Sequence, residues 1–230
     1  MVSRWEQKSK QLRSNLVNDK LRVADLTFRY SKHDPELYDG LSLTFTPGKI
    51  TAITGESGRG KSTLLYILGL MLAPTAGNIY YGHTDLTALN DSQKSSYRAH
   101  NFGFIFQNAE LDPNRSIIDS VCEPGIYTHV NRRTQETYAL ELLTRMGVDN
   151  EAYRKPGQIS GGQAQRVAVC RALINNPHII LADEPTGNLD EHNSLIVLNA
   201  LREAAQSDKT VLIATHDPTV INYADDVVQL

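Results

Sequence analysis

Short, mostly apolar runs recur along the chain, and each ends at polar or glycine-rich residues. They cover residues 50–54, 102–106, 179–184 and 210–215. Runs of this length, rich in branched and aromatic side chains, are typical of strands buried on both faces of a sheet. Segments with a helical spacing of apolar residues separate them, so the pattern predicts an α/β core with 210–215 as its last strand.

A second pattern occupies the first third of the chain. Apolar residues alternate with polar ones over 26–30 and 41–45, and Asp-Pro, Asp-Gly and Pro-Gly turn signals lie between or after them. Alternation with turn signals predicts antiparallel strands, which we expect to pack beside the strand at 50–54. A further short strand is expected over 79–82.

Apolar residues recur every three or four positions elsewhere, which predicts helices. The clearest cases are the residues that follow Lys61 and the segment 134–146. A mostly apolar helix is expected over 167–174, with Ser160 as its N-cap, and another over 194–204.

The domain organisation is inferred from a change in the sequence pattern after residue 107. Prolines divide the segment 108–157, which indicates helices inserted between two parts of the α/β core. We therefore predict a polar N-terminal extension over 1–19 and one domain over 20–230. A helical subdomain at about 108–174 interrupts that domain.

Composition and charge narrow the classes of function. The chain has 230 residues, and its formal net charge of −3 gives no basic footprint, so we expect no nucleic-acid partner. No apolar run approaches the roughly 20 residues that cross a bilayer. The charged N-terminus lacks the apolar core of a secretory signal. We expect a soluble protein that acts at a membrane only through a partner.

The chain has two cysteines, Cys122 and Cys170, which lie far apart and fit no metal-ligand spacing. We expect both to be buried thiols rather than a disulfide, which suits a reducing compartment.

The strongest chemical signal is the nonapeptide 55–63, GESGRGKST, which fits the phosphate-binding pattern G-x-x-x-x-G-K-[ST]. It follows a predicted strand and opens a predicted helix, which is the context that this pattern requires. The bland alternative is a glycine-rich turn with an unrelated lysine. As a phosphate loop, its backbone N–H groups would hold an anion with the help of the helix dipole. Lys61 would add a charge, and Ser62 a hydroxyl for Mg²⁺.

Two acids, Asp183 and Glu184, end the apolar run at 179–184. Ligands of open α/β sheets bind beyond the carboxyl ends of the strands. Asp183 would hold Mg²⁺ and Glu184 would face the attacking water. Without the phosphate loop, we would read both acids as caps of the next turn. His216 ends the run at 210–215 and can reach a γ-phosphate from there, although a lone histidine in this position is more often structural.

Two further features, the Ser-Gly-Gly at 160–162 and Tyr30, are ambiguous when each is taken alone. A Ser-Gly-Gly at 160–162 begins a helix and is an anion site in principle, although many helix caps look alike. Tyr30 ends a predicted strand upstream of the phosphate loop. Its ring would stack on adenine or would be an ordinary core or edge aromatic, and the residues alone leave both open.

Taken in order, these pieces resemble the nucleotide-binding domain of the ABC transporter superfamily from about Leu21 onward. Ser160-Gly161-Gly162-Gln163 matches the family signature and precedes Asp183 by 23 residues, a short separation that the family shows. The resemblance implies an α/β phosphate-loop NTPase core with an antiparallel β subdomain and a helical subdomain. The macrolide-export, lipoprotein-release and cell-division branch is the most similar one.

The resemblance also implies a role for each matching residue. Glu184 would be the general base, His216 the γ-phosphate switch, and Gln107 a contact to Mg²⁺ or water that senses the membrane subunit. Lys61 would be catalytic as well as phosphate-binding. The implied ATP-binding residues are Tyr30, Gly55, Ser57, Gly58, Gly60, Lys61, Ser62, Thr63, Ser160, Gly161, Gly162, Gln163 and Asp190, and the implied metal-binding residues are Ser62, Gln107 and Asp183.

The implied function is an ATPase that uses ATP and Mg²⁺ and closes head-to-tail on a second copy of itself. It would energise an integral membrane permease at the cytoplasmic face of the membrane. One alternative is an ABC ATPase that transmits force or signal to a membrane partner without carrying substrate. A soluble phosphate-loop kinase is a third possibility, against which the signature and the pair Glu184 and His216 argue.

The chain departs from the family pattern at a few positions. Arg59 stands in the phosphate loop where a small residue is usual, and we expect it to point to solvent. Ile159 replaces leucine before the signature, and Asp119-Ser120-Val121 stands where Glu-Asn-Val is common. The chain stops at Leu230, so the usual C-terminal strand and helix are expected to be trimmed or absent. None of these changes removes a catalytic group.

Overall fold

The parallel strands predicted from the apolar runs form one sheet. The computed structural model describes residues 20–230, and the extension predicted over 1–19 lies outside the described residues. In the described part, five parallel strands run in the order β6-β7-β8-β3-β9. Their bounds are β3 Ile50–Thr54, β6 Phe102–Ile105, β7 Ile179–Asp183, β8 Thr210–Ala214 and β9 Asp226–Gln229. The predictions for the first four of these strands are confirmed.

The alternating segments near the N-terminus form a second, antiparallel sheet in the order β2-β1-β4-β5. Its strands are β1 Leu21–Phe28, β2 Leu37–Phe45, β4 Ala76–Tyr81 and β5 Thr84–Asp85. The pairing of β1 with β2 shifts register on both sides of Leu26, beside Asp25 with its φ of 51°. Irregularities of this kind bend a strand and increase its twist.

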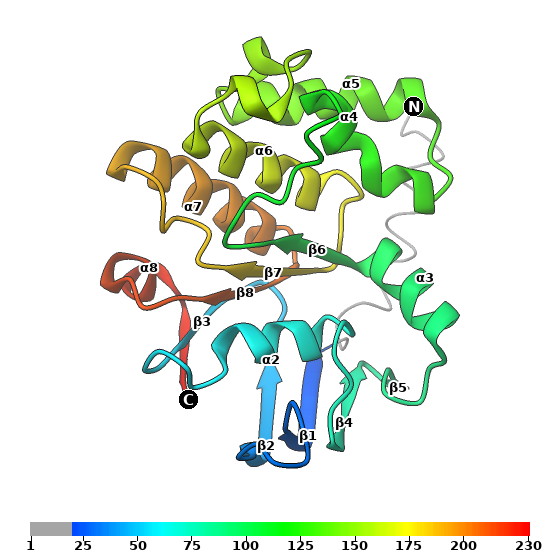
Figure 1. Cartoon of the computed structure of the whole chain (residues 1–230), viewed down its shortest axis with the longest axis vertical. Coiled ribbons are helices and arrows are strands. Elements are labelled where there is room, and N and C mark those ends of the chain that lie inside the picture. The colour runs from blue at the N-terminus through cyan, green and yellow to red at the C-terminus, as the bar shows by residue number, and fades with distance from the viewer. Residues whose placement is uncertain (1–19) are drawn as a thin grey trace.

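Helix α2 (Lys61–Leu68) lies between the two sheets (Figure 1). Its leucines and isoleucine are buried in one apolar cluster with residues of β1 and of the parallel sheet. Burying one such side chain contributes roughly 1.5–3 kcal/mol. The antiparallel strands therefore pack against the helix that follows the phosphate-loop sequence, which fixes where that loop sits.

The other face of the parallel sheet is covered by helices. Successive residues of β7 face opposite sides: Ile179 and Leu181 belong to the cluster around α2, whereas Ile180 and Ala182 belong to the second cluster. That second cluster contains residues of α4 (Ile117–Cys122), α5 (Arg132–Arg145), α6 (Gly161–Leu173) and α7 (Glu191–Gln206). The helix predicted over 134–146 corresponds to α5.

Helices α4, α5 and α6 come between β6 and β7 in the chain and form the upper layer in Figure 1. The same stretch holds 3₁₀ helices at Glu123–Tyr127, Asp149–Glu151 and Pro156–Gln158. The remaining helices are α3 (Asp91–Asn101) and α8 (Pro218–Tyr223). This arrangement is compatible with an inserted helical subdomain at about 108–174, whose limits stay a prediction.

Two expectations about the C-terminal part were wrong. The run at 210–215 is not the last core strand, because β9 follows and pairs with β3 in parallel. Its residues alternate between half-buried and exposed, so no continuous apolar run marks it. The helix predicted from Ser194 begins three residues earlier, because the Asp190 side chain accepts from the Asn193 N–H and caps it there.

Cys122 and Cys170 are both buried free thiols, as predicted. Burial raises the pKa of the Cys122 thiol to about 11 and that of Cys170 to about 12. Among residues 20–230, no helix is long and apolar enough to cross a membrane.

Candidate functional site

The loop between β3 and α2 depends on glycine at two of its turns. Gly55 has a φ of 149° and Gly60 a φ of 92°, which residues with side chains rarely adopt. A Cβ atom at Gly55 would also lie 2.7 Å from the carbonyl oxygen of Leu230. Ser57 and Gly58 are exposed between these two turns. The loop ends where α2 begins, at Lys61.

Positive charge gathers at this loop. The Lys61 ammonium donates hydrogen bonds to the carbonyl oxygens of Gly55, at 2.8 Å, and Glu56, at 3.1 Å. It therefore lies over the loop, beside the positive end of the α2 dipole. The Arg59 side chain is 62% exposed and lies 3.5 Å from the Glu56 carboxylate. The expectation that Arg59 points to solvent is confirmed.

Asp183 connects the end of β7 to the start of α2. Its Oδ1 accepts a hydrogen bond of 2.9 Å from the Ser62 hydroxyl. Burial raises the pKa of the Asp183 carboxyl, against the opposing effect of the Ser62 hydrogen bond. A carboxylate and a hydroxyl side by side are the hard oxygen donors that Mg²⁺ takes alongside phosphate oxygens and water. The residues present thus fit the predicted metal.

Glu184 follows Asp183 and turns sharply out of the strand, with a φ of 44°. Its Oε1 lies 2.6 Å from His216 Nδ1, and its Oε2 accepts from the Thr215 hydroxyl at 3.0 Å. The His216 side chain is 78% exposed, whereas that of Glu184 is 14% exposed. A left-handed residue other than glycine is a strained conformation that often accompanies a functional site. The interpretation of the two acids as simple turn caps does not account for these contacts.

Tyr30 lies beside the same loop. The residue is 64% exposed, and its hydroxyl is 2.6 Å from the Thr63 hydroxyl, with either group as donor. Phe28 packs edge-on against it with ring centroids 4.9 Å apart. Tyr30 is therefore not a core aromatic. An exposed ring beside the loop is compatible with base stacking, which stays a prediction.

The signature Ser160–Gln163 starts α6 at a different place in the fold. The Ser160 hydroxyl accepts from the Gln163 N–H at 3.2 Å, and the Gln163 side-chain oxygen accepts from the Ser160 N–H at 2.8 Å. This reciprocal cap confirms Ser160 as the N-cap. Gly161 is exposed. Across residues 20–230, no hydrogen bond or ion pair links this signature to the phosphate loop.

Asp190 is tied to the signature helix through residues that the sequence did not single out. Its carboxylate accepts from the N–H of Asn193 at 2.8 Å and from the Asn193 amide at 2.7 Å. These bonds lower the pKa of Asp190. Asn193 in turn accepts a hydrogen bond from Arg166 of α6. Gly162 lies close by, since a Cβ there would be 3.2 Å from Leu189.

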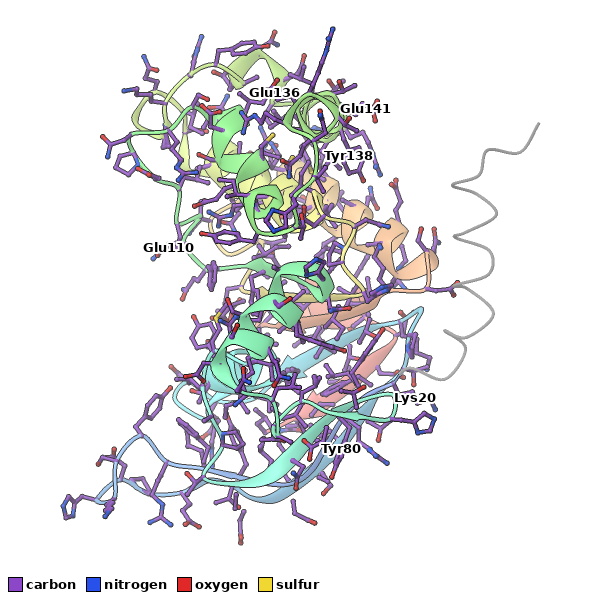
Figure 2. The ribbon with its side chains drawn as sticks, turned by 90° about the vertical axis from the view of Figure 1, so that its right-hand side faces the viewer. Lys20, Tyr80, Glu110, Glu136, Tyr138 and Glu141 are labelled. Atoms are coloured by element: carbon purple, nitrogen blue, oxygen red, sulfur yellow. The ribbon has the colours of Figure 1, made fainter. Side chains whose placement is uncertain are left out.

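Gln107 follows the predicted strand 102–106, lies two residues beyond the end of β6 and is exposed. The backbone around it is held by two residues of α6 that we did not predict. The Gln165 amide donates to the Phe106 carbonyl at 3.1 Å. Arg171 donates to the carbonyls of Ala109, at 2.8 Å, and Glu110, at 2.6 Å. Figure 2 shows Glu110 at the margin where the helical layer meets the sheet.

Comparison with known proteins decides the family. The sequence profile described as "ABC transporter" matches residues 38–187. The chain belongs to the ABC transporter family. The dimeric structure of the ABC transporter cassette MJ0796, described as bacterial, superposes with a TM-score of 0.85 at 33% identity, over 91% of this chain and 94% of that one. A second MJ0796 structure, a post-hydrolysis state bound to ADP and Pi, gives a TM-score of 0.83 at 32% identity with the same coverage.

The chain covers different shares of the length of two curated relatives. The chain is 41% identical to the lipoprotein-releasing system ATP-binding protein LolD of Paramagnetospirillum magneticum, over 88% of this chain and 90% of that protein. It is 39% identical to the macrolide export ATP-binding/permease protein MacB of Vibrio parahaemolyticus over 91% of its own length. It spans only 32% of that MacB protein.

The family and the fold establish this ABC cassette as an ATPase with an ATP-binding site. Its own geometry gathers Lys61, Ser62, Asp183, Glu184 and His216 around the carboxyl ends of β3, β7 and β8. Such a set supplies positive charge, a hard metal ligand pair and an oriented carboxylate. Those are the components of metal-assisted phosphoanhydride hydrolysis.

Proposed function

We propose that this chain binds and hydrolyses ATP to energise a separate integral membrane permease, through closure and opening of a dimer of two copies. The observation that carries the proposal is the position of Asp183 and Glu184. At the end of one strand, the first acid contacts the phosphate-loop serine and the second contacts His216.

The phosphates bind in the loop 55–63 in this proposal. Backbone N–H groups between Gly55 and Lys61, the start of α2 and the Lys61 ammonium provide the positive charge. Lys61 exchanges its two carbonyl partners for phosphate oxygens, which costs it little because each carbonyl is replaced by a charged acceptor. Tyr30 stacks on adenine, and Thr63 beneath it faces the phosphates.

Ser62 and Asp183, with Gln107 at the rim, are the residues that would hold Mg²⁺. The metal, when bound, neutralises charge on the phosphate oxygens. The neighbouring Glu184 accepts the proton of the attacking water. Thr215 and His216 keep the Glu184 carboxylate in one orientation by occupying both of its oxygens. A positioned general base of this kind contributes on the order of 10²–10⁴-fold to the rate.

A second copy of the chain completes the site. Ser160, Gly161, Gly162 and Gln163 lie apart from the loop of their own chain, and an exposed helix start is suited to an anion held by another subunit. A head-to-tail pair places each signature over the partner's loop with twofold symmetry. The dimeric structures of MJ0796 support such a pair. Asp190, next to α6, then lies near the interface between the two copies.

The permease docks in a groove between the sheet and the helical layer. The groove measures about 310 Å³ and is lined largely by apolar side chains, including Met71, Phe104, Phe106 and Tyr127. Exposed Ile126 and Tyr127 lie together on its helical side. Exposed apolar groups of this kind mark interaction sites. Bound in this way, the chain lies at the cytoplasmic face of the membrane, with 108–174 as its helical subdomain.

Reconstitution tests this function. The chain is combined with its permease in vesicles, and ATP turnover and substrate movement are measured together. ATP-driven movement of substrate supports the proposal. Turnover that depends on the permease without any movement of substrate favours the alternative, an ABC ATPase that transmits force. Tyr127→Asp should weaken attachment to the permease, whereas Tyr153→Asp, which alters an exposed tyrosine elsewhere, should not.

A further inference from the structure

Tyr38 reaches the phosphate loop from the neighbouring sheet. It is the second residue of β2 and adopts a φ of 64°, which is uncommon for a residue with a bulky side chain. Its half-buried hydroxyl donates a hydrogen bond to the carbonyl oxygen of Gly60, the last loop residue before Lys61. A side chain from another sheet is thus fastened to the backbone of the loop at its junction with α2.

The contact fixes the direction of one particular N–H group. The Gly60 carbonyl also accepts the first hydrogen bond of α2, from the Leu64 N–H at 2.8 Å. In the described chain every peptide bond is trans, so the Gly60–Lys61 peptide is planar with its C=O and N–H on opposite sides. A carbonyl held toward Tyr38 and Leu64 therefore turns the Lys61 N–H the other way, toward the open start of the helix.

The same hydrogen bond strengthens that N–H as a donor. A peptide group whose carbonyl accepts hydrogen bonds is polarised, and its N–H becomes a better donor. Two donors on the Gly60 carbonyl polarise the peptide more than the helical bond alone.

Packing leaves little freedom at this contact. A Cβ at Gly60 would lie 2.5 Å from the Tyr38 hydroxyl oxygen and 3.0 Å from its ring. Burial raises the pKa of the Tyr38 phenol, so the hydroxyl keeps its proton and remains a donor at physiological pH. Tyr38 also lies next to the paired hydroxyls of Tyr30 and Thr63.

We propose that Tyr38 is a positioning residue for the nucleotide: through the Gly60 carbonyl, it holds and polarises the peptide whose N–H meets the phosphates. The inference rests on the proposed role of the loop 55–63 in binding ATP. Tyr38 itself touches no phosphate. Its effect is on affinity for nucleotides that carry a phosphate chain, and it acts in the isolated chain, before any dimer closes.

The test is the affinity of the full chain for Mg-ADP, which occupies the loop without hydrolysis. Tyr38→Phe keeps the ring and its packing and removes only the hydroxyl. One net hydrogen bond corresponds to roughly a 2- to 10-fold rise in Kd. Tyr223→Phe is the matched control. Tyr223 lies on α8, and the change removes a phenolic hydrogen bond of 3.1 Å to Asn199. It should leave the Kd at the wild-type value.

A purely structural role gives a different result. In that case, Tyr38→Phe lowers the melting temperature of the nucleotide-free protein, but the Kd and the increase in melting temperature on adding Mg-ADP stay unchanged. Positioning predicts the reverse, with a smaller ligand-induced increase because binding is weaker. An unchanged Kd overturns the inference. Lys61→Ala separates it from the wider proposal: unchanged affinity in that variant would show that the loop does not bind the phosphates at all.

Discussion

The Glu184 carboxylate lies 2.6 Å from Nδ1 of His216, and the Thr215 hydroxyl occupies its other oxygen. A carboxylate only accepts hydrogen bonds, so the imidazole Nδ1 is the donor in this pair. Both donors belong to the two residues that directly follow β8, and Glu184 itself directly follows β7. Two adjacent parallel strands therefore hold a single proton acceptor in place.

Replacing Glu184 by glutamine tests its role as the base. Glu184→Gln preserves shape but removes the basic oxygen. We expect ATP turnover to fall by about 10²–10⁴-fold, with ATP affinity retained. Because hydrolysis no longer opens the pair, a dimer should accumulate in ATP and be visible by size-exclusion chromatography. The control Glu203→Gln removes only an exposed pairing with Arg145 and should turn over normally. Normal turnover in Glu184→Gln would exclude it as the base.

Thr215 is expected to act through Glu184. Thr215→Val removes the hydroxyl that donates to Glu184 at 3.0 Å, at a fully buried position. Hydrogen bonds to charged groups are worth roughly 1.5–3 kcal/mol, so kcat should fall by at least about tenfold with little change in KM. In the Glu184→Gln background the same change should have little further effect. Thr210→Val, at the buried opposite end of β8, is the matched control. Equal losses in both backgrounds would show that Thr215 acts independently of Glu184.

Much of this site was predictable because its functional residues lie directly after strands that have a clear apolar pattern. Residues 50–54 and 179–184 are continuous apolar runs, and each leads directly into the residues that act. Parallel strands bring their carboxyl ends to one edge of a sheet, so Ser62 and Asp183 were expected close together, as they are. The glycines of the loop required no structure for their interpretation, since their positions in the nonapeptide imply left-handed turns.

Contacts between elements were not predictable in the same way. Tyr38 lies outside the alternating run 41–45, and neither its left-handed backbone nor its hydrogen bond to Gly60 could be read from the pattern. Arg166 and Arg171 look like ordinary polar positions of a helix until α6 packs beside other loops. β9 was missed because its residues alternate in burial at the sheet edge. The burial of Gln165 and Arg166 on α6 is likewise a result of packing, which the sequence pattern does not show.

The signature should matter for association rather than for binding by one chain. Ser160→Arg places a bulky charge at the start of α6, where a partner's nucleotide is proposed to lie. We expect the ATP affinity of the monomer to be preserved, while ATP-dependent dimers of the Glu184→Gln background disappear. Gln206→Arg adds the same charge at the exposed end of α7 and should leave dimers intact. Wild-type levels of dimer in Ser160→Arg would count against a site made from two copies.

Lys209 should make stability depend on pH. Its ammonium donates to Asn176 at 2.6 Å and to the Pro177 carbonyl at 2.8 Å, and burial lowers its pKa to about 8. An unfolded lysine has a pKa of about 10.4, so between these values the unfolded chain binds more protons than the folded chain. The free energy of unfolding must therefore rise with pH over that interval, by at most about 1.4 kcal/mol per pH unit from this group.

Denaturant titrations at pH 7 to 10 should show the difference in free energy of unfolding between wild type and Lys209→Met growing in favour of wild type. Lys20→Met, at an exposed lysine, controls for loss of charge. A difference independent of pH would mean that Lys209 titrates alike in the folded and unfolded chains.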